Sequence, residues 1–150
     1  MHEHEMGMGR PTRADDACAR FRLATPSSVA QDTPEALRDV ARQLRAHTDP
    51  PDFVTLHYGS ERSADEVWQN ARALFGARAL HGGSSCRGIM SDGTDPEAGE
   101  AAMGAFAIWD AEGDYGTASE EIASEPRAAA ARATRTALRR AGRAGEAPDL

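Results

Sequence analysis

The chain has 150 residues, the length of one ordinary domain, and its formal net charge at pH 7 is −7. This acidic balance argues against a general binder of nucleic acid or of anionic membranes, since such proteins carry a basic face. All 17 basic residues are arginine, which excludes a Schiff-base lysine and the lysine of a phosphate-binding P-loop. Val, Ile, Leu and Phe together number only 19, so we expect a thin core.

The start of the chain and the cysteine count indicate a cytoplasmic protein. Residues 1–19 are polar, show no periodicity and contain no apolar segment, so we interpret them as a disordered tail rather than a secretory signal. The sequence has no run of 18 apolar residues that would predict a membrane span. Cys18 and Cys86 are too few for a disulfide framework or a four-cysteine zinc site, and we expect reduced thiols.

The first half of the chain predicts two strands and one helix. Alternating apolar and polar residues predict a short strand at 21–24. Thr33 and Pro34 are typical of a helix start, with Thr33 as the N-cap, and an apolar stripe follows at helical spacing. The Asp-Pro-Pro-Asp run at 49–52 ends that helix. Residues 53–58, rich in β-branched and aromatic side chains, then give the strongest predicted strand.

The middle of the chain predicts a helix followed by a strand and a glycine-rich loop. Ser63 and Glu66 form a capping box that begins a second helix, and Gly76 is its expected end. A short strand is predicted at 78–81. It leads into a loop, Gly-Gly-Ser-Ser-Cys-Arg-Gly, at 82–88.

The next segment predicts a hairpin. Residues 102–109 are a strand candidate that Gly104 interrupts. A turn is expected at 110–114, and residues 115–118 are expected to pair back onto the preceding strand.

The last predicted helix has Ser124 as its N-cap and runs to about Ala141. Residues 146–150 then resemble the segment 49–53, which opens the central strand, so we expect the sequence to stop where a further strand should begin. A frayed terminus is the alternative. The predicted fold is therefore one α/β domain over residues 20–150. It has a layered mixed sheet of about five short strands and three main helices, incomplete at the C-terminus.

The glycine-rich loop is the predicted ligand site, because ligands in α/β sheets bind beyond the carboxyl ends of strands. Its glycines allow backbone amides to line a concave anion site, and Arg87 would pair with a carboxylate or phosphate. The alternative is a tight turn with Arg87 in water. The residues predicted to contact the ligand are Tyr58, Ser60, Ser84, Ser85, Cys86 and Arg87.

Cys86 also suggests nucleophilic chemistry. Arg87 is adjacent, and His57 and His81 lie at the ends of predicted strands, so a Cys–His pair could form. No acidic residue that would orient the histidine is identifiable, and free cysteines are commonly buried. We therefore favour a non-catalytic role, with each histidine hydrogen-bonded structurally.

Two charge patterns have a structural explanation. Asp110 and Asp114 could act as paired carboxylates, but aspartate is expected in a turn for conformational reasons. Arg132, Arg135 and Arg139 share one face of the last predicted helix. We interpret them as a solvated face above an alanine seam that packs on the sheet. Binding of RNA or of an acidic partner is the alternative.

The run FVTLHYGSERSADEVWQNARALFGARALHGGSSCRGIMSDG, followed by GAFAIWDAEGDYGTAS and an Ala/Arg-rich helix, resembles the N-terminal FIST domain family over roughly residues 20–150. In that family a strand with a small polar end, a helix, and a strand leading into a Gly-Ser/Thr-Cys-x-Gly loop follow one another. The matching residues are 55–60, 63–75 and 80–88. The resemblance implies an intracellular sensory module of bacterial signalling proteins that binds small ligands such as amino acids. It brings no established catalytic set, and it implies a C-terminal FIST domain or a signalling output domain as partner.

The sequence therefore predicts a cytoplasmic, non-catalytic sensory domain that binds a small polar ligand for signal transduction, without metal or cofactor. Two alternatives stay open. One is a cysteine-dependent enzyme centred on Cys86, and the other is an inactive half-domain that needs a partner.

Overall fold

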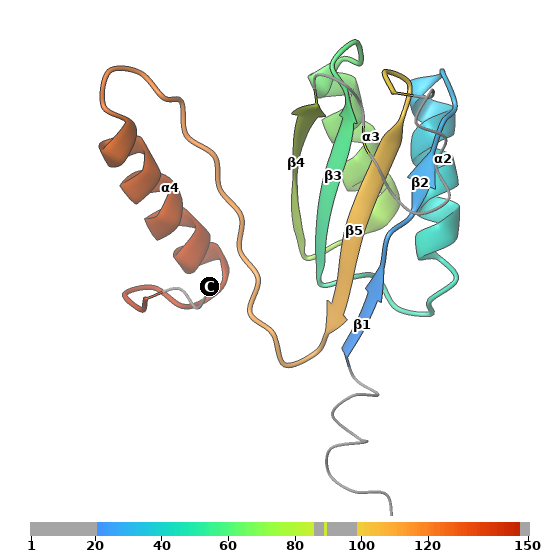
Figure 1. Cartoon of the computed structure of the whole chain (residues 1–150). Coiled ribbons are helices and arrows are strands. Elements are labelled where there is room, and N and C mark those ends of the chain that lie inside the picture. The colour runs from blue at the N-terminus through green and yellow to red at the C-terminus, as the bar shows by residue number, and fades with distance from the viewer. Residues whose placement is uncertain (1–20, 86–88, 90–98, 148–150) are drawn as a thin grey trace, which may run out of the picture.

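The computed structural model describes residues 21–85, 89 and 99–147 (Figure 1). The predicted tail at 1–19 and the predicted ligand residues Cys86 and Arg87 lie outside this part of the chain. Within it, no helix has both the length and the apolar character needed to cross a bilayer.

A five-stranded mixed sheet forms the centre of the fold, in the order β1-β5-β3-β4, with β2 also paired to β5. β3 and β4 run parallel, and the other pairs are antiparallel. This confirms the predicted α/β class, the mixed sheet and the three helices of the described part. The elements are β1 (Phe21–Ala24), β2 (Ser27–Ser28), α2 (Thr33–Leu44), β3 (Phe53–Gly59), α3 (Ala64–Phe75), β4 (Ala79–Ser85), β5 (Met103–Asp110) and α4 (Pro126–Arg140).

The core lies between the sheet and the helices α2 and α3, which lie together on one side of it (Figure 1). Alternate residues of β3 point into this layer, because successive side chains of a strand face opposite sides. Burying a large apolar side chain contributes about 1.5–3 kcal/mol, and alanines fill much of the remaining space. The largest fully buried side chains are Leu37, Met103, Val40, Val54 and Val67.

The helix ends follow local chemistry, with two corrections to the prediction. Ser63 is the N-cap of α3, and Gly76 ends that helix in the left-handed conformation, as predicted. The N-cap of α2 is Asp32 rather than Thr33, because the Asp32 carboxylate accepts the Glu35 amide at 2.8 Å. The N-cap of α4 is Glu125 rather than Ser124, and its side chain makes no capping hydrogen bond.

Two strands differ from the prediction at their glycines. β4 continues through the Gly-Gly-Ser-Ser run to Ser85, so the first four residues of the predicted loop, 82–85, belong to the strand. β5 continues through Gly104, which pairs with Ser27 on one side and His57 on the other. In both cases pairing with neighbouring strands decides the conformation.

The predicted hairpin is wrong, because β5 already has β3 on one side and β1 with β2 on the other. Residues 113–120 instead form an extended segment along the free edge of β4, where the Thr117 hydroxyl donates to the Leu80 carbonyl at 3.0 Å. α4 lies beyond this extended segment and apart from the sheet (Figure 1). Gly116 of the extended segment instead lies close to the backbone of α4 at Ala137 and Ala141, so the prediction that the alanine seam of α4 packs on the sheet is wrong.

Candidate functional site

The parallel pairing of β3 and β4 brings their carboxyl ends to the same edge of the sheet. Tyr58 pairs in register with Ser84, and Gly59 pairs with Ser85. Residues paired across neighbouring strands point to the same face, so Tyr58 and Ser84 both lie on the side of the helices. The Tyr58 side chain is only 7% exposed, whereas Ser84 is exposed.

The other predicted ligand residues are distributed around this edge. Ser85 and Gly59 share the helix-free face of the sheet, and Ser60 is exposed in the turn that leads to α3. The structure thus brings Ser60, Ser84 and Ser85 to one end of the sheet, with Tyr58 buried beneath them. The predicted Arg87 contact lies outside the described residues.

The segment that precedes β5 packs against the end of β3. The Gly59 amide donates to the Ala102 carbonyl at 3.2 Å. A Cβ atom at Gly59 would overlap the backbone carbonyl of Glu100, so this close approach requires glycine. The end of β3 is therefore in direct contact with the backbone that enters β5.

Arg62, in the turn after β3, bonds to the segment before α2 and to the segment before β5 at the same end of the sheet. Its guanidinium donates to the Thr33 hydroxyl at 3.1 Å, to the Gln31 carbonyl at 3.3 Å, and to the carbonyls of Ala30 and Ala101. The pKa of Arg62 is lowered from its ordinary value by loss of hydration, an effect opposed by nearby carboxylates. The Nε atom is buried and has no hydrogen-bond partner in the described part of the chain.

Sequence reasoning missed Arg62. It lies in a polar turn among other charged residues, where an arginine is ordinarily solvated. Its partners are mostly backbone carbonyls of distant loops, and such acceptors leave no trace in the residue pattern.

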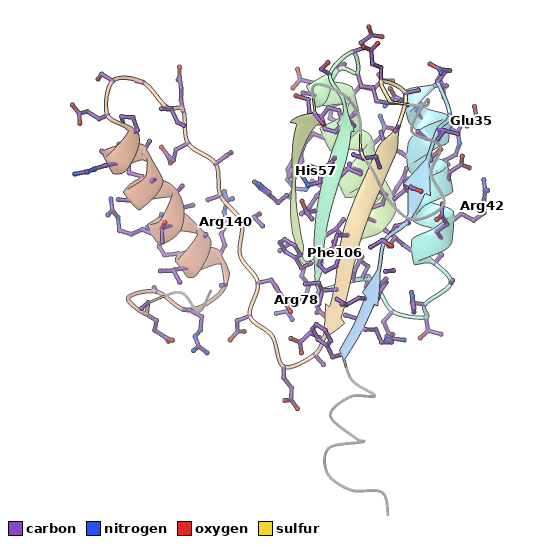
Figure 2. The ribbon with its side chains drawn as sticks, viewed as in Figure 1. Glu35, Arg42, His57, Arg78, Phe106 and Arg140 are labelled. Atoms are coloured by element: carbon purple, nitrogen blue, oxygen red, sulfur yellow. The ribbon has the colours of Figure 1, made fainter. Side chains whose placement is uncertain are left out.

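The two candidate histidines lie on the helix-free face of the sheet. His57 Nε2 is 3.1 Å from the Thr55 hydroxyl, which confirms the predicted hydrogen-bonded histidine at this position. His81 pairs in register with Thr55, and both imidazoles are exposed. Figure 2 shows His57 and Phe106 on the central strands of the sheet.

The carboxylates of the turn after β5 have separate structural partners. Asp110 accepts the Tyr115 hydroxyl at 3.0 Å, and Asp114 pairs with Arg143 at 3.2 Å. Burial, followed by the hydrogen bond to Asp110, raises the pKa of Tyr115 to about 12. These contacts agree with the structural interpretation of the pair.

Within the described residues, no group of three or more His, Cys, Asp and Glu side chains is placed to hold a metal ion. Comparisons with family models, with curated proteins and with solved structures found no match. The function is therefore argued from the residues and geometry of the site and from the motif resemblance.

Proposed function

We propose that this chain is a cytoplasmic sensory domain of the FIST N-terminal type that binds a small polar ligand, such as an amino acid, without transforming it. The observation that carries the proposal is the parallel register of β3 and β4. It sets Ser60 and Ser84 at one carboxyl edge, where ligands of α/β sheets bind.

The proposed contacts to the ligand come from two serine hydroxyl groups and from one arginine. Ser84 and Ser60 are exposed, and their hydroxyl groups can accept a hydrogen bond from an ammonium group or donate one to a carboxylate. Arg87, two residues after the end of β4, would pair with the ligand carboxylate. For signalling, the ligand has to bind one conformation of the domain better than another.

Thermal unfolding of the chain in the presence of a panel of amino acids and small carboxylates tests this proposal. A ligand that binds only the folded state at about 100 times its Kd adds about 2.7 kcal/mol to the free energy of unfolding. We expect one panel member to raise the midpoint in a saturable way, and Ser84→Ala to reduce that rise. The exposed Ser124, outside the site, provides the matched control Ser124→Ala. If no panel member shifts the midpoint of the wild-type chain, the proposed ligand class is wrong.

A further inference from the structure

A groove lies along the outer edge of β4, near the start of that strand. Its volume is about 330 Å³, within the range of small-molecule sites. It lies between α3 and the extended segment 113–120, and its lining includes Trp68, Arg72, Arg78, Leu80 and Arg140. The proposed amino-acid site is at the other, carboxyl end of β4, so the two sites are independent.

The groove is basic although the chain is acidic. Three arginines line it, from α3, from the residue before β4 and from α4, and no lining residue is an aspartate or glutamate. Arg78 pairs with Asp52 at 3.3 Å. Figure 2 shows Arg78 beside the sheet and Arg140 on α4.

The other two guanidinium groups have no carboxylate partner among the described residues. Arg140 donates to the Thr117 carbonyl at 2.7 Å, and the Arg72 side chain is exposed with no hydrogen bond or ion pair to the described chain. Guanidinium groups form paired hydrogen bonds with phosphate and carboxylate oxygens. The groove therefore offers two uncompensated positive charges to an anion.

An aromatic ring and an apolar surface adjoin these charges. Trp68 is 46% exposed, although large apolar side chains of α3 otherwise turn toward the core. Leu80 and Ala77 supply further apolar surface in the groove. An exposed indole suits a ligand with a planar ring, because aromatic rings stack on tryptophan. The neighbouring guanidinium groups can in addition lie over the face of such a ring.

We infer that this groove binds a small organic anion that joins a phosphate group to a planar aromatic ring, the chemistry of a mononucleotide. The phosphate lies between Arg72 and Arg140, and the ring lies against Trp68. A phosphate suits the site better than a single carboxylate, because it brings up to two negative charges to two unpaired arginines.

Fluorescence titration with adenosine 5′-monophosphate tests this inference directly. The second tryptophan, Trp109, is 3% exposed and bonded to the Asp49 carbonyl, so a ligand in the groove changes chiefly the emission of Trp68. We expect saturable quenching that weakens as the salt concentration rises. The double variant Arg72→Gln/Arg140→Gln should raise Kd by at least about tenfold, which corresponds to about 1.4 kcal/mol.

The matched control is Arg143→Gln. Arg143, just after α4, also connects this helix to the extended segment through an ion pair with Asp114, but it does not line the groove. The control variant therefore measures the effect of loosening α4 without removing a groove residue. We expect Arg143→Gln to keep the wild-type Kd, and both adenosine and inorganic phosphate to bind more weakly than the nucleotide. The inference is overturned if the nucleotide produces no saturable quenching, or if the double glutamine variant binds it as tightly as the wild type.

Discussion

At the scale of single residues, the partly buried guanidinium of Arg62 is expected to contribute to stability through its bonds to segments distant in sequence. Arg62→Ala would leave the carbonyls of Ala30 and Ala101 without their donor, and an unsatisfied buried polar group costs about 1–3 kcal/mol. We expect the free energy of unfolding, measured with urea, to fall by about that amount. The exposed Arg38 on α2 provides the control, and Arg38→Ala should change stability by less than about 0.5 kcal/mol. Equal effects of the two variants would contradict the proposed role of Arg62.

Arg87 is the proposed partner of the ligand carboxylate in the amino-acid site. A hydrogen bond to a charged group contributes about 1.5–3 kcal/mol, so Arg87→Ala should weaken binding of the active panel member by that amount. Isothermal titration calorimetry measures the change, with the exposed Arg45→Ala on the far end of α2 as control. A folded Arg87→Ala variant with unchanged affinity would remove Arg87 from the site.

The raised pKa of Tyr115 makes the free energy of unfolding fall at alkaline pH. Its pKa is raised to about 12 in the folded chain, against an ordinary value of 10.0, so the fold favours the protonated phenol. Between pH 10 and 12 the unfolded chain has lost this proton and the folded chain has kept it. Stability from Tyr115 is therefore present below pH 10 and is lost as the pH rises toward 12. In urea titrations across this window, Tyr115→Phe should show a smaller loss of stability than the wild type, and identical pH dependences would refute the effect.

At the scale of elements, local patterns predicted the helices and strands well, because caps, periodicity and β-branched runs act within a few residues. Ser63 and Gly76 bound α3 as expected, since each acts on the backbone next to it. The pattern predicts a loop at Gly82 and an interruption at Gly104, but both lie within strands, because partner strands distant in sequence hold them in the sheet. Tertiary pairing overrides the weak strand propensity of glycine.

Gly59 is required at the end of β3 by the close approach of the segment before β5. Gly59→Ala would drive a Cβ into the backbone of Glu100, which cannot move as a side chain would, so we expect a loss of about 1–3 kcal/mol. Gly83, in the neighbouring strand, is the matched control, because a Cβ there meets no atom within 4 Å. Gly83→Ala should leave stability unchanged or raise it by up to about 1 kcal/mol. Urea unfolding of both variants measures the difference, and similar losses would disprove the close contact.

At the scale of the whole molecule, the order of the elements predicts that Ser60 and Ser84 share one end of the sheet, but it does not predict the contacts around them. The strand–helix–strand order at 53–85 implies parallel strands, and this is sufficient to place Ser60 near Ser84. The burial of Tyr58 and the loop contacts of Arg62 depend on segments far apart in sequence. For the same reason the pattern could not show that the C-terminal segment leaves the sheet after β5.

The placement of α4 against the extended segment depends on Gly116. A Cβ at this position would overlap the backbone of α4 at Ala137 and Ala141. Gly116→Ala should therefore displace α4, while the core between α2, α3 and the sheet, which Gly116 does not contact, should be retained. Amide hydrogen exchange distinguishes these two regions, because each region opens locally with its own free energy and exchanges at its own rate.

We expect faster amide exchange in α4 of Gly116→Ala and unchanged exchange in β3 and β5. Because Arg140 reaches the groove beside β4 from α4, the same variant should also weaken nucleotide quenching of Trp68. The proposed amino-acid site is formed at the ends of β3 and β4, so its stabilising ligand should act on this variant as on the wild type. Unaltered exchange in α4 would show that the helix does not depend on this contact.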